Sequence, residues 1–147
     1  HNSWLLIQTL ETLGLRVDKH SDNALEVAKF LESHPKVKAV NYPGLKSNKY
    51  YDKAQKYFKG GKASGLISFD VESFEEAKRI IDSVKLFSVV VNIGDSKSLI
   101  THPASTTHSQ MSPEELVKAG VNPVTVRLSI GLENTADLIE DLNQALN

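Results

Sequence analysis

Two short stretches of alternating character, Leu66 to Val71 and Thr125 to Ile130, constrain the fold of this chain most strongly. In each stretch every second residue is apolar, and successive side chains of a β-strand point to opposite faces of a sheet. Each stretch is therefore predicted to be a strand with one buried face. In the second stretch the alternation places Arg127 and Ser129 opposite to the apolar residues.

The segments around these strands have helical spacing. From Ser3 to Glu32 apolar residues recur every three or four positions, which predicts one long helix with a single buried stripe. The stripe consists of Leu6, Leu10, Leu13, Val17, Ala24, Ala28 and Leu31. Helix starts are indicated by capping patterns at Ser73-Phe74-Glu75-Glu76, at Ser112-Pro113-Glu114-Glu115 and at Asn134.

Two further strands are predicted, at Val37 to Tyr42 and at Phe87 to Val91, and the second should be buried because it is a β-branched run. A short helix is predicted over Ser47 to Lys59, ended by Gly60-Gly61. Helices and strands therefore interleave, which indicates an α/β fold with helices covering one face of a small sheet of about four strands.

Composition limits the classes of function. The chain has 147 residues and 40% hydrophobic content, enough for one domain with a core. Its 17 basic and 18 acidic side chains give a net charge of −1, which argues against a nucleic-acid or membrane partner for the chain as a whole. Cysteine is absent, so disulfides and thiolate metal sites are excluded. No signal-peptide pattern is found, and we expect a cytoplasmic protein.

One segment combines positive charge with aromatic rings. Six lysines interleave with four rings here: Lys46, Lys49, Lys53, Lys56, Lys59 and Lys62 with Tyr50, Tyr51, Tyr57 and Phe58. Basic residues interleaved with aromatic ones are typical of nucleic-acid binding. The interpretation favoured by the sequence is a solvated lysine face over an aromatic inner face.

Arg127 is the sharpest candidate for a binding residue. An arginine in mid-strand offers a rigid fork of donors suited to a carboxylate. The alternative is a solvated arginine or a structural ion pair. Asn92 lies where a predicted strand leaves through Gly94, and its amide is suited to donate to a ligand oxygen; the alternative is a loop amide that bonds its own backbone.

The histidines give only weak signals. His102 and His108 lie six positions apart, with Asp95 nearby, which is a poor pattern for a metal, and no metal site is expected. A hydrolase triad of Ser105, His102 and Asp95 is equally unsupported, because the chain has no Gly-x-Ser-x-Gly nucleophile elbow.

Three groups of residues, found together in this order, resemble a known family: Asn92-Ile93-Gly94-Asp95, His102-Pro103-Ala104-Ser105 and Val126-Arg127-Leu128-Ser129-Ile130-Gly131-Leu132-Glu133. They are similar to the C-terminal part of the pyridoxal-phosphate enzymes of cysteine and methionine metabolism. The resemblance covers essentially the whole chain. It implies the α+β small domain of a fold-type I enzyme, with a mostly antiparallel sheet over residues 33–147 and a linking helix over residues 1–32.

The resemblance also implies roles for single residues. Arg127 matches the family arginine that clamps the substrate α-carboxylate, and Asn92 matches a strand-end position that helps to bind the same group. Ser105 and Thr107 match a loop near the active-site mouth, with no catalytic role. Many lyases of the family have serine at the position of Asn92, so asparagine favours the O-acetylhomoserine sulfhydrylase branch, which makes homocysteine and acetate. Methionine γ-lyase, cystathionine γ-synthase, the cystathionine lyases and a free-standing binding module remain alternatives.

The family's cofactor lysine belongs to its large domain, and no lysine of this chain lies in that motif. We therefore expect no catalytic residue and no cofactor-binding residue in this chain. We expect it to be a piece of a longer polypeptide whose large domain holds pyridoxal 5'-phosphate. The expected partners are a small amino-acid substrate, the large domain of the same chain, and further copies in a homo-oligomer, a tetramer by family resemblance.

Overall fold

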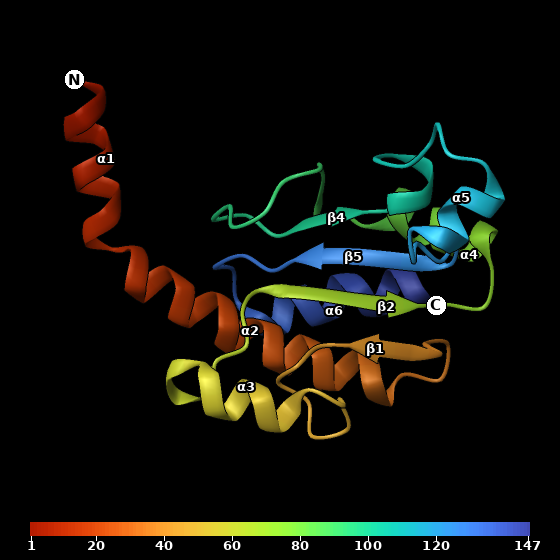
Figure 1. The fold of residues 1–147 in the computed structure, drawn as a ribbon, viewed down its shortest axis with the longest axis horizontal. Coiled ribbons are helices and arrows are strands. Elements are labelled where there is room, and N and C mark those ends of the chain that lie inside the picture. Colours follow the sequence, from red (N-terminus) through yellow and green to blue (C-terminus); the bar gives the residue numbers. More distant parts are fainter.

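The computed structural model describes the backbone of residues 1–147 and every side chain except those of Pro113 and Val117. Helices and strands alternate along most of the chain (Figure 1). In order, the elements are α1 (Asn2–Glu11), α2 (Leu13–Ser33), β1 (Ala39–Asn41), α3 (Tyr51–Tyr57), the 3-10 turn η1 (Lys59–Gly61), β2 (Leu66–Asp70), α4 (Phe74–Ser83), β3 (Ser88–Val89), β4 (Leu99–Thr101), the 3-10 turn η2 (Pro103–Ser105), α5 (Pro113–Lys118), β5 (Thr125–Ser129) and α6 (Thr135–Leu146).

The strands form one five-stranded sheet in the order β1-β2-β5-β4-β3. All neighbouring strands pair antiparallel except β3 and β4, which are parallel. The predicted α/β class and the mostly antiparallel sheet are therefore confirmed. Strand β5 lies between β2 and β4, and Arg127 is paired with Ser68 on one side and with Thr101 on the other.

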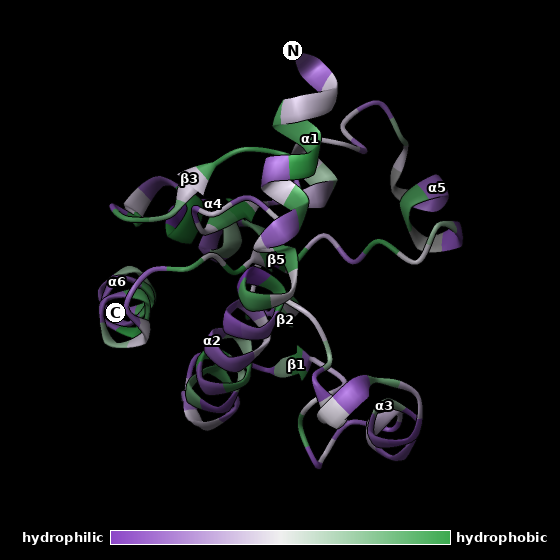
Figure 2. Ribbon diagram, turned by 90° about the vertical axis from the view of Figure 1, so that its left-hand side faces the viewer, coloured by the Kyte–Doolittle hydropathy of each residue, from purple (hydrophilic) through white to green (hydrophobic). Residues whose placement is uncertain are grey.

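The core lies on one face of this sheet. Alternate residues of β2 and β5, such as Phe69 and Leu128, are buried there against α2, α4 and α6. These helices contribute Ala24, Val27, Ala28, Leu31, Ala77, Ile80, Leu138, Leu142, Ala145 and Leu146. The prediction that helices cover one face is confirmed (Figure 2), and the strand residues that alternate with the core residues, including Arg127, lie on the other face.

The predicted single helix from Ser3 to Glu32 is wrong in one respect, because it is interrupted at Thr12. Beyond the break, the Arg16 guanidinium donates to the carbonyl of Thr9 at 2.6 Å. All residues of α1 are exposed, so among the described residues no buried side chain holds α1 in line with α2. The predicted stripe is therefore buried only in α2, from His20 onward, and its residues in α1 are exposed. Gly14 lies after the break, and a side chain there would contact nothing within 4 Å.

The predicted buried strand from Phe87 to Val91 is also wrong. Only Ser88 and Val89 form a strand, at the edge of the sheet, and the three valines from position 89 to 91 are about half exposed. The buried strand is instead β4, which the sequence placed in a loop. Residues in β4 are buried because β5 pairs with them on the inner side and β3 covers the outer edge.

The lysine-rich segment is arranged differently from the sequence interpretation. Helix α3 buries Ala54, whereas Tyr50, Tyr57 and Phe58 are 46%, 72% and 49% exposed. Tyr51 is half-buried. The predicted aromatic inner face is therefore wrong for Tyr50, Tyr57 and Phe58, because the small Ala54 makes the helix contact and leaves these three rings outside.

The predicted helix caps are confirmed. Ser73 accepts the backbone N–H of Glu76 at 3.2 Å, and Asn134 accepts that of Ala136 at 2.9 Å. Ser112 and Glu115 form a reciprocal pair, in which Ser112 N–H donates to the Glu115 carboxylate at 2.8 Å. This bond lowers the pKa of Glu115. Within the described chain, no helix has both the length and the hydropathy to cross a membrane.

A buried carboxylate on α6 holds the turn that leads into β3. Asp141 is 6% exposed, and its two oxygens accept the backbone N–H groups of Lys85, Leu86 and Phe87 at 2.8–3.2 Å. Sequence periodicity gave no sign of this role, because Asp141 follows an ordinary charged helix pattern. The contact fixes where the chain enters the sheet after α4.

Replacing Asp141 by Asn should destabilise the 147-residue chain by roughly 2–3 kcal/mol, because charge-assisted hydrogen bonds are lost and an amide NH₂ faces backbone donors. Urea unfolding followed by circular dichroism measures the effect. Glu140→Gln, an exposed change one residue earlier, is the matched control and should stay within about 0.5 kcal/mol. Equal midpoints for the two variants would contradict the assigned role of Asp141.

Candidate functional site

Arg127 lies near the middle of β5, on the face of the sheet that the core helices leave open. It is half-buried, and within the described side chains it forms no ion pair and no hydrogen bond. A cavity of about 270 Å³ opens beside it. Besides Arg127, the residues that line this cavity are Asn41, Pro43, Ala63, Ser64, Leu66, Ile67 and Ser68. The structural ion pair considered from the sequence is thus not formed by the described residues.

The loop after β3 reaches the same face of the sheet. The backbone N–H of Gly94 donates to the hydroxyl of Ser129 at 3.1 Å, and Ser129 is two residues from Arg127 along β5. Gly94 has φ of +79°, a conformation that favours glycine. The structure therefore fixes the loop that carries Asn92 to the strand that carries Arg127.

The side chain of Asn92 is exposed. Its oxygen accepts the backbone N–H of Ile93 at 2.9 Å, which is the local bond that the sequence analysis gave as the alternative. An amide has both an acceptor and a donor end, and this bond uses only the acceptor. The amide NH₂ has no partner among the described residues, and it is open to solvent.

His102 is a structural residue. It is 2% exposed, and its Nε2 lies 2.7 Å from the carbonyl of Pro123. Because a carbonyl only accepts, Nε2 carries the hydrogen, and Nδ1 then accepts from the hydroxyl of Ser105 at 2.8 Å. Both ring nitrogens are used, and the edge of the ring packs on Phe74 with centroids 5.1 Å apart.

Asp95 does not meet this histidine. Its carboxylate accepts the backbone N–H of Lys97 at 3.0 Å, and that bond lowers the pKa of Asp95. The triad considered from the sequence therefore lacks its acidic member, although Ser105 and His102 are in contact.

The loop with Ser105 and Thr107 is tied to the strand beside Arg127. Thr101 is paired with Arg127 on the neighbouring strand, and its hydroxyl donates to the hydroxyl of Thr106 at 3.1 Å. Thr106 also donates to the carbonyl of His102 at 2.8 Å. Both Ser105 and Thr107 are exposed. The structure thus brings the three predicted groups, Arg127, the Asn92 loop and the Ser105–Thr107 loop, onto β5 and its neighbour β4.

Sequence reasoning missed the polar residues of α2 that hold the end of β5. His20 Nδ1 donates to the carbonyl of Ile130 at 2.7 Å. Asn23 Nδ2 donates to the carbonyls of Gly131 and Glu133 at 3.1 and 2.9 Å. Both side chains are buried and share a helix face with Ala24 and the following core residues. Polar residues inside an apolar stripe were the available signal, because buried polar groups need partners.

The same turn is closed from the other side by a carboxylate and a hydroxyl. Glu133 accepts the Ser98 N–H at 2.7 Å and the Ser98 hydroxyl at 2.8 Å. The Ser98 oxygen accepts the N–H of Gly131 at 2.8 Å. Ser96 accepts the N–H of Leu132 at 2.9 Å. We call Ser98, Gly131 and Glu133 the clamp, because together they join the loop after β3 to the end of β5.

Gly131 has no room for a side chain in this clamp. A Cβ there would lie 2.4 Å from the Glu133 carboxylate and 2.5 Å from backbone atoms of Ser96 and Lys97. The backbone of one loop must therefore move if position 131 carries any side chain. The lack of space for a Cβ therefore explains why position 131 is glycine.

Gly131→Ala should lower the unfolding free energy by roughly 1–3 kcal/mol and speed amide exchange at residues 94–98, because overpacking displaces the loop. Gly14→Ala is the matched control: position 14 is helical and open, so the same change should stabilise by up to about 1 kcal/mol. Hydrogen exchange and urea unfolding measure both effects. Unchanged exchange at residues 94–98 in Gly131→Ala would show that the two loops are not coupled.

The described lysines give no buried amine for a covalent cofactor. Every lysine is exposed or half-exposed, and Lys62, one of the two half-exposed lysines, is paired with Asp18 and Asp22 at 3.4 and 3.1 Å. The open face with Arg127 is suited to hold an anionic group of a ligand, and it offers no amine to react with it.

Comparison with known proteins gives consistent matches. The chain is 51% identical over 146 residues to O-acetyl-L-homoserine sulfhydrylase of Leptospira meyeri. The matched segment covers 99% of this chain and 33% of that protein. It is 43% identical over 146 residues to L-methionine gamma-lyase of Treponema denticola, with 99% and 36% covered.

A solved structure is also similar. It is described as an O-acetylhomoserine (thiol)-lyase of Campylobacter jejuni, and it carries a pyridoxyl-lysine-monophosphate residue. The TM-score is 0.93 at 60% identity, covering 99% of this chain and 34% of that one. The chain thus spans about a third of the length of these relatives. The Cys/Met metabolism PLP-dependent enzyme family matches residues 1–147, and the chain belongs to that family.

Proposed function

We propose that this chain is the C-terminal domain of an O-acetylhomoserine sulfhydrylase, and that it binds the α-carboxylate of the amino-acid substrate. The reaction would convert O-acetylhomoserine and sulfide to homocysteine and acetate. Support comes from the sulfhydrylase relatives, from the asparagine at position 92, and above all from Arg127. The observation that carries the proposal is a half-buried arginine on an open sheet face, beside a cavity and without an internal carboxylate.

Arg127 is suited to orient a substrate rather than only to attract it. Its guanidinium is planar and offers two parallel donors to a carboxylate. Strands β2 and β4 hold β5 on both sides, so the base of the side chain is fixed. Orientation of a reactant by a rigid group contributes several of the roughly 7–11 kcal/mol that positioning supplies.

Asn92 would supply the second contact to the same carboxylate through its free amide NH₂. The hydrogen bond from Gly94 to Ser129 keeps its loop on β5, and the clamp keeps the far end of that loop in place. Ser105 and Thr107, held through Thr106, would line the mouth of the site without a catalytic role.

The cofactor would be held elsewhere in the complete polypeptide. Pyridoxal phosphate, when bound, supplies the electron sink that elimination and replacement at the γ-carbon require. No lysine of this chain is placed to hold it, so we place the lysine and the remaining cofactor contacts in a large domain outside these residues. The catalytic residues would lie there too, in a cytoplasmic homo-oligomer, a tetramer by family resemblance.

A related activity is the second candidate. Relatives include L-methionine gamma-lyase and the O-succinylhomoserine sulfhydrylase of Mycobacterium tuberculosis, at 43% and 40% identity. Cystathionine γ-synthase, the cystathionine lyases and a free-standing binding module are weaker alternatives. A direct assay of the complete protein with acetyl- and succinyl-homoserine and sulfide, and with methionine alone, separates them: acetylhomoserine with sulfide should be the preferred pair.

The apolar residues of α1 would face the large domain. Four apolar side chains are each more than half exposed and are covered by no described segment: Trp4, Leu6, Ile7 and Leu10. Exposed apolar patches of this kind mark protein interfaces. The helix would therefore join the two domains of one polypeptide.

The 147-residue chain alone should consequently self-associate through α1. Leu6→Glu should shift it toward monomer in analytical ultracentrifugation, because a charge opposes burial of the patch. Glu11→Gln, a change of charge at the polar end of the same helix, should have little effect. A monodisperse monomer for the unaltered chain at high concentration would contradict the interface.

Arg127→Lys in the complete enzyme should lower kcat/KM for the amino-acid substrate roughly ten- to hundredfold, because lysine keeps the charge and loses the two-point fork. Sulfide has no carboxylate, so its apparent KM should change little. Asn92→Ala should cost less, roughly two- to tenfold, since a neutral donor is weaker. Steady-state kinetics with each substrate varied in turn measures these effects.

Arg79→Lys is the control for the arginine change itself. Arg79 donates to the carbonyls of Ala145 and Leu146 at the end of α6 and contacts nothing on the open face. Its kinetics should match those of the unaltered enzyme. If Arg127→Lys behaved like Arg79→Lys while fold and cofactor content were kept, Arg127 would be a structural strand arginine.

A further inference from the structure

The segment around α3 concentrates positive charge. Residues 46–62 hold six lysines and one aspartate, whereas the whole chain has a net charge of −1. The remainder of the chain therefore carries an excess of negative charge. Such a distribution orients a polyanion toward α3 and away from the other faces. We call the side chains of Lys49, Tyr50, Lys53, Lys56 and Tyr57 the α3 surface.

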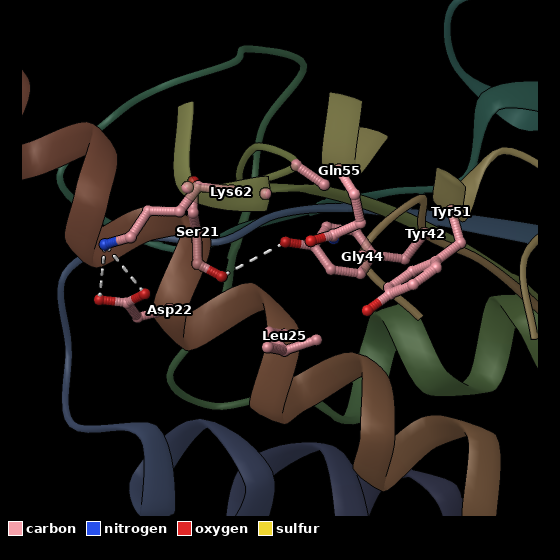
Figure 3. Close-up of a pocket in the computed structure, with 11 residues that line it drawn as sticks. Ser21, Asp22, Leu25, Tyr42, Gly44, Tyr51, Gln55 and Lys62 are labelled. Atoms are coloured by element: carbon pink, nitrogen blue, oxygen red, sulfur yellow. Dashed lines mark hydrogen bonds and ion pairs between the residues drawn. The ribbon is translucent and has the colours of Figure 1, made fainter. Parts of the chain in front are cut away.

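The lysines of the α3 surface are free of internal ion pairs. Within the described side chains, Lys49, Lys53 and Lys56 contact no carboxylate. Lys62, by contrast, is paired with Asp22 (Figure 3) and also with Asp18. The charges of the first three lysines are consequently not neutralised inside the chain. Instead, their amino groups lie over aromatic rings, Lys49 and Lys53 over Tyr50 at 4.9 and 5.6 Å, and Lys56 over Tyr57 at 5.3 Å.

Both tyrosines of this surface are exposed. Tyr57 is 72% exposed and Tyr50 46%. The contacts of α3 with the domain are made by its other side, where Ala54 is buried and Tyr51 and Gln55 line a cavity of about 250 Å³ opposite Leu25 of α2 (Figure 3). Folding therefore accounts for the inner side of α3 and leaves the rings on its outer side unexplained.

Tyr42, which also lines that cavity, makes its hydrogen bond within the chain. The hydroxyl of Tyr42 donates to the carbonyl of Ser64 at 2.9 Å, and burial, with the nearby Asp22, raises the pKa of Tyr42 to about 12. The Tyr42 hydroxyl is thus satisfied within the chain. The unpaired lysines and the open rings of this region lie on the outer side of α3.

We propose that the α3 surface binds single-stranded nucleic acid, with the lysines on the phosphates and bases stacked on Tyr50 and Tyr57. Every base has a ring face, so such stacking tolerates any sequence, and a lysine-lined track follows the backbone. An acidic protein is also attracted by the lysines, and poly-glutamate in the test represents that partner. A lipid surface fits poorly, because α3 is seven residues long and exposes no aliphatic side chain to insert. The inference goes beyond the proposed sulfhydrylase function and does not rest on it.

The test is fluorescence anisotropy of the complete protein with labelled single-stranded RNA and DNA of about 12 nucleotides, at several salt concentrations. Lys49→Gln/Lys53→Gln/Lys56→Gln should flatten the salt dependence, lowering the log–log slope by about 2, since each phosphate contact to a single strand contributes about 0.7. Tyr50→Ala/Tyr57→Ala should weaken binding at least about fivefold with the slope kept. Lys78→Gln/Lys85→Gln/Lys118→Gln, exposed lysines on other elements, is the matched control and should leave the affinity and, to within about half a unit, the slope unchanged.

Enzyme activity in the α3 variants should equal that of the unaltered protein, which separates this inference from the catalytic proposal. Binding of RNA, DNA or both with these variant effects supports it. Three results would overturn it: no binding at low salt, equal loss in the control variant, or equal binding to poly-glutamate or phosphatidylserine vesicles. Tighter binding to duplex than to single strands would also overturn it, because paired bases are not free to stack on the rings.

Discussion

The hydrogen bonds between Glu133 and Ser98 are the interaction on which the arrangement of the open face depends. They tie the loop after β3 to the turn after β5, and Gly131 fits between the two only because it lacks a side chain. From the opposite side, His20 and Asn23 fix the same turn to α2. A helix, a loop and the central strand are thus locked together near Ser129. Arg127 lies two residues before Ser129 on β5, between paired residues of β2 and β4.

These contacts explain why the candidate binding residues are held in fixed positions. The sheet and the clamp hold Arg127 and the loop of Asn92 on one surface, while the described chain supplies neither a buried amine nor an acid–base pair on that surface. Two carboxylates, those of the half-buried Glu133 and the buried Asp141, hold backbone N–H groups, a role in which charge strengthens each bond. The buried polar groups of this chain therefore hold its loops and strands in position. Under the proposed function, the reactive groups would lie in the large domain of the complete polypeptide.

Much of the architecture follows from local pattern. Alternation identified β2 and β5, and capping residues located the starts of α4, α5 and α6, because both signals lie within a few neighbouring residues. The errors have one origin, which is that burial depends on distant partners. Val89 to Val91 look like a core strand and lie at the sheet edge, whereas β4 contains only Leu99–Thr101 and is buried by β5. The rings of α3 look like an inner face, yet Ala54 makes the contact. For the site, the motifs indicated Arg127 and Asn92, but their support by His20, Asn23 and Ser98 required the fold.

The central claim is that Arg127 acts on the substrate through the α-carboxylate. A double cycle tests it most directly: kcat/KM for O-acetylhomoserine and for its α-carboxamide, each with the unaltered enzyme and with Arg127→Ala. If the arginine binds that group, removing the carboxylate should cost the unaltered enzyme roughly tenfold or more and cost the variant little, because the two changes delete one interaction. Equal penalties in both proteins would show that Arg127 and the carboxylate do not interact, and would contradict the proposed role of this domain.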